Sequence, residues 1–502
     1  MNTLAGDGVP GLDKTQIVGT KASGSHLGRL LAVIFILKVV LYSLDPHTRF
    51  QLGDSASYLY TALTGWMPPD RSFTYGFLIR PLAVWTHSFV PLMIFQFCIS
   101  GIAAWIVSVC LVRFFRVRFW LAAVAGLLCA IGPLQLISER FVLTEAPSTF
   151  LFAFYILLAL EYMKSGRLAI LVLLQVVAIP LISLRISFLP LVLLSSLLLP
   201  LLGPWGRILW RKMRDIRGQN GFPWPGLRQA VVHLLIAVVV SQVCLFCYRH
   251  VNGRLSKLPA AYVYADGQFL LCFWAPIVQK GDFPIPELRN AIFDSLQYNL
   301  RDPELRNNQC YSPGGLIPNL TKAVEAHNGG PDEQLVYKLA KRTALAAARR
   351  DPLALIRLSA KTFAGYFDNP SFRTQVEVDE GFHNSGSPEF KQELLTKFGE
   401  RYDGVHIQSL IQRYHNGMVP WYRFLIAAPL VFIPLALFAD REYLPQWIYL
   451  GIVALMFAAQ AVVVAPTPTA RYLTALSWVV ILMFSAALGT IYERQVSRTN
   501  VP

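Results

Sequence analysis

Long runs of apolar residues recur along most of this chain, and they constrain its fold more than any other feature of the sequence. A run of about 20 apolar residues is the length that an α-helix needs to cross the hydrocarbon core of a bilayer. Within hydrocarbon, every backbone donor and acceptor must find its partner inside the same segment, and an α-helix meets that requirement. Composition agrees, because 54% of the residues are hydrophobic and only 15% are charged, against about 25% charged in soluble domains. The sequence therefore predicts an all-α polytopic membrane protein and argues against a soluble fold.

About ten segments are apolar enough to be predicted as membrane spans. They lie at residues 27–44, 88–112, 119–137, 146–163, 168–184, 187–203, 229–248, 421–439, 447–465 and 472–491. They divide the chain into an N-terminal module of seven helices at 27–248, with its first outer loop at 45–87, and three C-terminal helices at 421–491. Residues 1–26 are mostly polar and no small-residue cleavage site follows the first span, so we expect a flexible cytoplasmic tail there. A second cytoplasmic tail is expected at 492–502.

The Lys and Arg residues of the short loops are distributed unequally, and this predicts the orientation of the spans. With the N-terminus inside, the tails and the short inner loops contain both Lys and Arg, whereas the basic residues of the short outer loops are all arginines. The outer arginines are Arg49, Arg71, Arg80, Arg140, Arg185 and Arg471. Because basic residues concentrate in cytoplasmic loops, both termini are expected to be cytoplasmic. The net charge of +15 follows largely from this bias and requires no nucleic-acid partner.

Residues 249–420 interrupt the pattern of spans. They contain 18 of the 30 acidic and 20 of the 45 basic residues, and turn dipeptides such as Pro313-Gly314. At about 170 residues, this segment is large enough for a core of its own, so we expect a mostly helical outer domain between the seventh and eighth spans. Helical periodicity between Glu333 and Phe367 is broken at Asp351-Pro352, which predicts two helices, the second basic, amphipathic and lying on the membrane. Residues 268–278 are apolar but too short to span, and fit a buried or interfacial segment.

The cysteines leave one question open. Cys272 and Cys310 are the only pair in the outer segment, and they can form a disulfide in an oxidising compartment. Cys244 and Cys247 form a Cys-x-x-Cys inside a span, without the second pair that a zinc site of this kind needs. We therefore predict no metal site from the cysteines.

Charged residues of the outer loops are the most informative part of the sequence. Ionisable groups at the edge of a membrane are costly and are more often functional than structural. They are Asp54, Asp70, Arg71 and Arg80 in the first outer loop, Arg140 and Glu145 in the second, Arg185 in the third, and Arg471 beside Tyr472 in the last.

The residue types of this set indicate a reaction. A carboxylate at the outer face can take a proton from an acceptor hydroxyl as a general base, and Asp54, Glu145 and Asp70 are the candidates. Arginines can hold a phosphate bidentately and stabilise it as a leaving group. The candidate phosphate ligands are Arg140, Arg471, Arg185 and Arg80, and the candidate substrate contacts are Tyr58, Arg71, Tyr75 and Tyr472. A base beside a phosphate clamp describes glycosyl transfer from a phosphate-linked donor.

Two absences narrow the choice of donor. The largest inner segment, at about 204–228, is shorter than the roughly 30 residues of one nucleotide-binding βαβ unit, and the chain contains no Asp-x-Asp. A sugar nucleotide therefore has no evident site, and a lipid phosphate that reaches the outer face through the membrane is expected instead. No cofactor is expected, because no cluster of histidines and carboxylates demands a metal, although a divalent ion bridging Asp54 and a phosphate stays open.

With these residues in this order, the chain resembles the C-type (GT-C) multi-span glycosyltransferases, the superfamily of protein O-mannosyltransferases, lipid A aminoarabinose transferases and arabinosyltransferases. The resemblance is carried by Asp54 in Gly-Asp-Ser-Ala-Ser-Tyr, Arg140 with Glu145, Arg185, and Arg471-Tyr472. It implies a polyprenyl-phosphate sugar as donor, a glycan, lipid or protein as acceptor, and a location in the bacterial inner membrane.

The resemblance also implies an inverting displacement, in which Asp54 deprotonates the acceptor and polyprenyl phosphate departs toward the arginines. Several relatives have a second acid next to the first, whereas here Ser55 follows Asp54 and the next acid is Asp70. Either of these two aspartates therefore remains open as the base.

Each of these residues also has a structural interpretation. Asp54 can cap the following helix, Asp70 can form a turn with its neighbour, and Glu145 can favour a helix N-terminus. The arginines can anchor to lipid head groups, as Lys38 in the first span is expected to do by snorkelling. The tyrosines fit an aromatic belt as readily as a sugar-binding wall.

Two other functions stay open. An envelope polysaccharide polymerase or ligase would also use outer arginines, but on polyprenyl-diphosphate glycans, and mutation of Asp54 would then matter little. A transporter or flippase of lipid-linked substrates would show two similar halves with broken helices, and the sequence contains no such internal repeat.

Overall fold

The computed structural model describes residues 14–51, 54–205, 224–293, 310–311, 313–379, 387–400, 409–437, 443–465 and 467–499. Throughout these residues the regular structure is helical, and the strand-like pairing is limited to one parallel bridge between Arg49 and Phe141. The predicted all-α class is therefore confirmed for the described part of the chain.

The first part of the chain forms a series of apolar helices. In order they are α1 (Lys14–Leu44), α2 (Asp54–Thr64), α3 (Thr74–Ile79), η1 (Arg80–Val84), α4 (Val90–Phe114), α5 (Phe119–Ala130), α6 (Pro133–Ser138), α7 (Glu145–Ser165), α8 (Leu168–Leu184), η2 (Ile186–Phe188), α9 (Leu189–Pro200), η3 (Leu201–Trp205) and α11 (Trp224–Ser256). Since α1 begins at Lys14, the predicted flexible tail is helical from that residue on, and residues 1–13 lie outside the described ones. Gly166 ends α7 with a φ of 65°, a left-handed conformation that favours glycine after a helix.

The second part begins with shorter helices and ends with apolar ones. They are α12 (Asp266–Trp274), η4 (Ala275–Ile277), η5 (Lys280–Asp282), α13 (Pro286–Phe293), α15 (Leu316–Asn328), α16 (Glu333–Arg350), α17 (Pro352–Gly365), α18 (Asn369–Asp379), α19 (Pro388–Phe398), α20 (Leu410–Met418), η7 (Val419–Trp421), α21 (Tyr422–Leu437), α22 (Leu444–Val463), η8 (Ala470–Tyr472) and α23 (Leu473–Thr499). The predicted break at Asp351 is confirmed. Its carboxylate accepts the N–H of Ala354 at 2.8 Å and so caps α17.

Seven of the described helical stretches are long and apolar enough to cross a membrane, which supports a multi-span membrane protein. They are Gly24–Leu44, Val90–Phe114, Glu145–Ser165, Ile186–Gly203, Arg228–Ser256, Leu444–Val463 and Ala470–Val496. The other three predicted spans coincide with the shorter helices α5, α8 and α21. The continuous helix predicted at 119–137 is corrected, because α5 ends at Ala130 and α6 starts at Pro133, where proline favours a new first turn.

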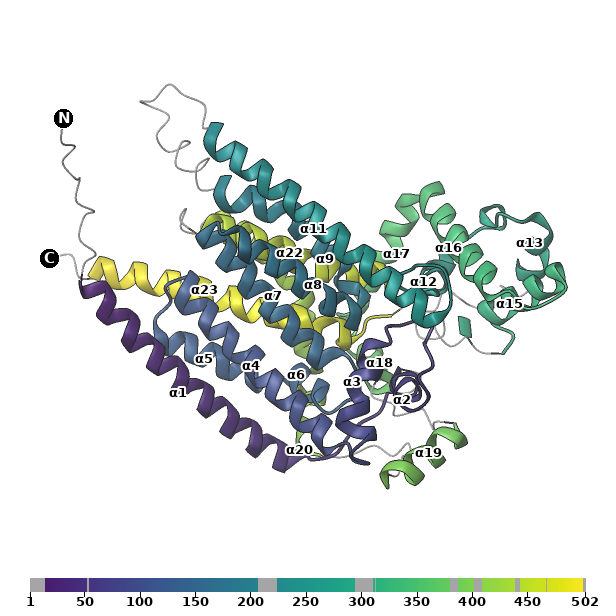
Figure 1. Ribbon diagram of the computed structural model, residues 1–502, viewed down its shortest axis with the longest axis horizontal. Coiled ribbons are helices and arrows are strands. Elements are labelled where there is room, and N and C mark those ends of the chain that lie inside the picture. The colour runs from purple at the N-terminus through teal and green to yellow at the C-terminus, as the bar shows by residue number, and fades with distance from the viewer. Residues whose placement is uncertain are drawn as a thin grey trace, which may run out of the picture.

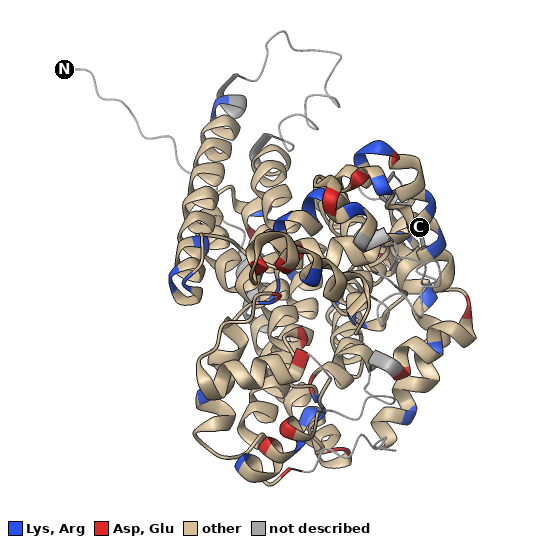
Figure 2. Cartoon of the chain, turned by 90° about the vertical axis from the view of Figure 1, so that its right-hand side faces the viewer, with Lys and Arg blue, Asp and Glu red and all other residues tan. Residues whose placement is uncertain are grey.

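The bundle has two different ends. α1 begins and α23 ends at the same end (Figure 1), where Arg113 pairs with Glu161 and Arg118 pairs with Glu493. We call this the basic end. Helices α12, α13, α15 and α16 lie at the opposite end (Figure 1), which we call the distal end. Figure 2 views the molecule from the distal end and shows charged residues on these shorter helices, whereas long stretches of the bundle carry none.

The residues between α11 and α21 pack in three different places. Helices α12, α15 and α16 share a core of their own, which includes the fully buried Leu271. Helix α18 instead joins the core of the bundle through Phe372, and α19 packs Phe390 and Phe398 against the helices of the first outer loop. Each amphipathic helix buries its apolar face on the nearest apolar surface. The described parts of 249–420 therefore do not share one core.

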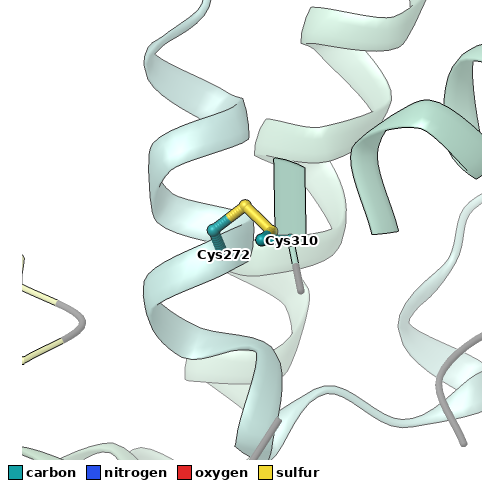
Figure 3. Close-up of a disulfide and its surroundings, with 2 residues drawn as sticks. All are labelled: Cys272 and Cys310. Atoms are coloured by element: carbon teal, nitrogen blue, oxygen red, sulfur yellow. A yellow bond between two sulfur atoms is a disulfide. The ribbon is translucent and has the colours of Figure 1, made fainter. Parts of the chain in front are cut away.

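Cys272 and Cys310 form a disulfide, with Cα atoms 5.8 Å apart (Figure 3). The pairing that the sequence left open is thus present in the structure. It links α12 to a residue 38 positions further along the chain. Both cysteines are fully buried.

Lys38 contradicts the expectation that it snorkels to the membrane surface. Its side chain is 2% exposed, and its ammonium group donates to the carboxylate of Glu139 and, at 2.7 Å, to the carbonyl oxygen of Ala130. Ser100 donates its hydroxyl to the same carboxylate. Because the chain after α5 packs against α1, a buried anion is within reach, and the lysine pairs inside the protein instead of extending to the head groups.

Candidate active site

Arg471 joins two carboxylates that are far apart in the sequence. Its Nη2 donates to Asp54 Oδ2 at 2.9 Å and lies 2.8 Å from Glu145 Oε1, to which its Nε also donates at 2.9 Å. Asp54 begins α2, Glu145 begins α7, and Arg471 lies in the turn η8 before α23. The partial positive charge of a helix N-terminus stabilises both carboxylates there.

Arg71 and Asp70 extend the cluster on one side. The guanidinium group of Arg71 pairs with the carboxylates of both Asp54 and Asp70, and its Nε donates to Asp70 Oδ2 at 3.1 Å. The two adjacent residues therefore pair with each other, as their structural interpretation expects, while Arg71 also reaches the candidate base. Cζ of Arg71 lies 5.7 Å from the ring centre of Tyr58.

Arg185 extends the cluster on the other side. Its Nη1 donates to Glu145 Oε1 at 3.2 Å, and its Cζ lies 5.4 Å from the ring centre of Tyr472. Helix α8 stops at Leu184 and the backbone of Arg185 is extended, so this arginine occupies the short connection between two apolar helices. The charged residues of this connection and of η8 thus meet at Glu145.

Tyr75 lies close to the cluster but is engaged by the protein. Its ring centre is 5.1 Å from that of Tyr58, and its hydroxyl donates to Gln96 Oε1 at 2.8 Å. The side chain is fully buried. Tyr75 therefore supports Tyr58 from the protein interior.

Two of the predicted phosphate ligands lie elsewhere. Arg140 is fully buried and donates to three backbone carbonyl oxygens at 2.6 to 3.0 Å, with its Nε 3.2 Å from the carboxylate of Asp45. Arg80 donates to the carbonyl oxygen of Ala62 at 2.8 Å and lies over the ring of Phe77. The expectation that both gather with Asp54 and Arg471 is thus corrected, because the protein itself provides acceptors for their guanidinium groups.

The charges of the cluster compensate one another. It contains the carboxylates of Asp54, Asp70 and Glu145 and the guanidinium groups of Arg71, Arg185 and Arg471. Burial acts to raise the pKa of Asp54, but the nearby guanidinium groups of Arg71 and Arg471 outweigh it and hold the pKa well below its usual range. Asp54 is therefore ionised at neutral pH.

Glu145 has one carboxylate oxygen that accepts no hydrogen bond from the residues that the structure describes. Its side chain is 2% exposed, and Oε1 accepts from both Arg185 and Arg471. Oε2 is buried and has no hydrogen-bond partner among the residues that the structure describes. A buried acceptor left unpaired costs about 1–3 kcal/mol, so this oxygen is a place where a hydroxyl of a bound molecule would be stabilised.

Two cavities have Arg471 and Thr474 in common as wall residues. One has an empty volume of about 510 Å³, open solvent included, and its walls include Arg185 and Tyr472, the polar residues Ser148, Thr149 and Gln460, and the apolar residues Phe188 and Phe457. The other has an empty volume of about 400 Å³ on the same measure, and its walls include Glu145, Ile137, Leu143 and His415. The ion-paired cluster therefore borders a cavity on either side of Arg471.

Several residues of these walls were not predicted from the sequence. Ser148 and Thr149 are adjacent in the first turns of α7, and Gln460 is near the end of α22; only the presence of polar residues in apolar helices could have marked them. His415 belongs to α20, where no motif surrounds it, and its Nδ1 lies 2.8 Å from the hydroxyl of Tyr422. Their position in the site is a consequence of helix packing.

In the described part of the chain, no three His, Cys, Asp or Glu side chains are grouped to hold a metal ion.

Comparison of the chain with protein-family models, with curated protein sequences and with solved structures returned no match.

Proposed function

We propose that this protein is a membrane glycosyltransferase that transfers a sugar from a polyprenyl-phosphate donor to an acceptor hydroxyl, with inversion. One observation supports the proposal most directly: Arg471 binds Asp54 and Glu145 and also lines, with Arg185, the cavity whose walls include Phe188 and Phe457. A carboxylate to accept the hydroxyl proton and cations to receive a leaving phosphate are thus next to each other.

The larger cavity suits a lipid-linked phosphate. Arg185 and Arg471 provide charge for the phosphate, and the hydroxyl of Thr149 can donate a hydrogen bond to it. Phe188 and Phe457 provide an apolar wall for the first part of the lipid. Phe188 and Phe457 belong to helical stretches that are apolar enough to cross a membrane, and the proposal requires that the lipid chain enters the cavity from the bilayer between such helices.

Donor binding would prepare Asp54 to act as the base. While Arg71 and Arg471 both bind its carboxylate, Asp54 has little affinity for a proton. A phosphate bound to Arg471 competes with Asp54 for the same guanidinium group, and loss of that partner raises the pKa of Asp54. The acid thus becomes basic when the donor is in place.

The displacement then follows from this arrangement. The acceptor oxygen bonds to the anomeric carbon, and its proton passes to Asp54. The bond between that carbon and the phosphate oxygen breaks, and its electron pair leaves with polyprenyl phosphate. Arg185 and Arg471 stabilise the charge that develops on the phosphate, and Glu145 Oε2 accepts a hydrogen bond from a substrate hydroxyl.

The proposal includes a topology of ten spans, in which α5, α8 and α21 also cross the membrane. The termini would be cytoplasmic, and the cluster would lie at the outer face of a bacterial inner membrane. Arg113, Arg118 and Lys164 at the basic end support this orientation, because basic residues concentrate on the cytoplasmic side. Membership of the GT-C superfamily, which the sequence resemblance implies, is part of the same proposal.

The test is turnover by the purified protein in lipid, given polyprenyl-phosphate sugars and candidate acceptors. We expect release of polyprenyl phosphate by the wild type and a loss of at least about 100-fold in Asp54→Asn. Asp70→Asn is the matched control, because Asp70 binds the same guanidinium group of Arg71, and we expect a smaller loss. Activity retained in Asp54→Asn but lost in Glu145→Gln or in Asp70→Asn would assign the base to Glu145 or to Asp70, and activity retained in all three variants would overturn carboxylate catalysis.

The same assay separates the alternative functions. Turnover of polyprenyl-diphosphate glycans, with none of any monophosphate donor, would identify a polysaccharide polymerase or ligase. Movement of a labelled lipid across the bilayer without release of polyprenyl phosphate would identify a transporter.

A further inference from the structure

The first outer loop holds the start of α12 beside the cluster. The carbonyl oxygen of Pro69 accepts the backbone N–H groups of Tyr264 and Ala265, both at 2.9 Å. Asp70 follows Pro69 in the chain, and α12 begins at Asp266. These two hydrogen bonds therefore place the N-terminal end of α12 next to the Asp70–Arg71 pair.

Other contacts fix α12 in this position. Trp274 Nε1 donates to the carbonyl oxygen of Val463, at the end of α22, at 2.8 Å. Gly267 approaches the backbone of α16 so closely that a Cβ atom would overlap it, and Lys341 of α16 pairs with Asp266. A shift of α12 would break contacts with the first outer loop, α22 and α16 together.

The disulfide fixes the position of Tyr311 relative to α12. Cys310 is fully buried and bonded to Cys272 of α12 (Figure 3). The next residue, Tyr311, is 38% exposed, and its ring centre lies 6.3 Å from that of Phe269, on the preceding turn of α12. Phe269 lies in the first turn of α12, so this ring contact places Tyr311 at the end of α12 that Pro69 holds next to the Asp70–Arg71 pair.

We infer that Tyr311 forms an aromatic wall of the acceptor site and that the acceptor is a saccharide. The inference rests on the proposed function. A sugar ring packs its C–H face on an aromatic ring, while its hydroxyls bond to carboxylate and guanidinium groups, and the side chains of Tyr311, Asp70 and Arg71 provide this combination. Tyr311 follows Cys310, which is part of the α12–α16 core and is bonded to α12, and this position beside the shorter helices favours a water-soluble glycan over a lipid acceptor.

Steady-state kinetics with soluble oligosaccharide acceptors at saturating donor test the inference. We expect Tyr311→Ala to raise the acceptor KM by about three- to tenfold, with kcat and the donor KM nearly unchanged, and Tyr311→Phe to stay near the wild type. Tyr414→Ala is the matched control, because Tyr414 is also 38% exposed but lies on α20. Replacing both Cys272 and Cys310 with Ser should raise the acceptor KM as Tyr311→Ala does, because the disulfide positions the ring.

Release of polyprenyl phosphate by slow transfer to water, measured without acceptor, distinguishes the two possible failures. If the wild type releases none with or without acceptor, the proposed function fails, and the assignment of Tyr311 fails with it. If release is normal while Tyr311→Ala and Tyr414→Ala have the same acceptor KM, only the assignment of Tyr311 is overturned. Turnover with peptide or lipid acceptors and none with saccharides would overturn the acceptor class.

Discussion

Asp54 is held between two guanidinium groups, and this pairing determines how the site responds to pH. Arg71 and Arg471 hold the pKa of Asp54 well below its usual range although burial acts in the opposite direction. An aspartate has a pKa of about 3.9 in an unfolded chain. The carboxylate of the free protein therefore keeps its charge throughout the neutral and mildly acidic range.

Two pH dependences follow for Asp54. We expect kcat/KM, which reports the free enzyme, to show no loss from protonation of Asp54 down to about pH 4. Because the folded pKa lies below the unfolded one, the pairing stabilises the fold above about pH 3.9 and loses this contribution as the pH falls further. Both expectations are checked by measuring kcat/KM and the free energy of unfolding between pH 7 and pH 3. The free energy of unfolding of Asp54→Asn should fall less with acid than that of the wild type. An inflection of kcat/KM above about pH 5 that moves in Arg71→Gln would contradict the first expectation.

The position of the Lys38 side chain could not be predicted from the sequence. A lysine within an apolar run predicts snorkelling, because the sequence does not reveal that Glu139 will lie beside it. The structure buries both groups as a pair, with Ser100 donating to the same carboxylate. Removing one partner of a buried pair leaves the other charge uncompensated.

We therefore expect Lys38→Met to destabilise the protein by about 3–5 kcal/mol, and the double variant with Glu139→Gln to recover much of that loss. Unfolding in detergent, followed by circular dichroism, measures the change. Lys164→Met is the control, because Lys164 is exposed at the basic end, and a change within about 0.5 kcal/mol is expected there. Equal stability of Lys38→Met and the wild type would show that the pair contributes nothing to the fold.

At the scale of elements, α17 was predicted from its sequence and its surface can be tested. The periodicity and the Asp351-Pro352 break predicted its start, and the structure begins α17 at Pro352. Leu353 and Ile356 are 60% and 62% exposed, and Arg357 beside them is exposed as well. The helix packs against α22, which is apolar enough to cross a membrane. An exposed apolar face next to basic residues is typical of a helix that lies in the membrane interface.

Tryptophan substitution tests this position. We expect Leu353→Trp and Ile356→Trp to be quenched by brominated lipids, because an interfacial helix buries its apolar face by about 5–10 Å in the bilayer. Leu395→Trp on α19 is the control, since Leu395 is 44% exposed on a helix that packs against the helices of the first outer loop. The measurement compares each variant with the parent protein, and equal quenching at the three positions would contradict an interfacial α17.

At the scale of the whole molecule, the ends of the helices sort the charged residues into two groups. Arg113, Arg118 and their acidic partners lie at the basic end, and the Arg471 cluster lies near the distal helices. The charge bias of the loops predicts that these ends face opposite sides of the membrane. Helical packing and the loop charges agree on this division, although they are independent properties.

Labelling with a membrane-impermeant maleimide checks the orientation. In a variant whose free cysteines are replaced and whose Cys272–Cys310 disulfide is kept, we expect Glu325→Cys on α15 to react in intact cells and Lys164→Cys at the basic end to react only after lysis. Both positions are exposed. The reverse labelling pattern would show that the protein has the opposite orientation in the membrane and that the cluster does not lie at the outer face.

From sequence alone, the all-α class, the approximate positions of the apolar helices and all six members of the cluster could be predicted. These are local properties, since a run of apolar residues or a charge beside it needs no distant partner to be recognised. The packing of the helices was needed to show that Arg471 binds Asp54 and Glu145, that Arg140 is enclosed by backbone carbonyls, and that Cys272 pairs with Cys310. Which side chains meet depends on which helices become neighbours, and that follows from packing over the whole chain rather than from any pattern along it.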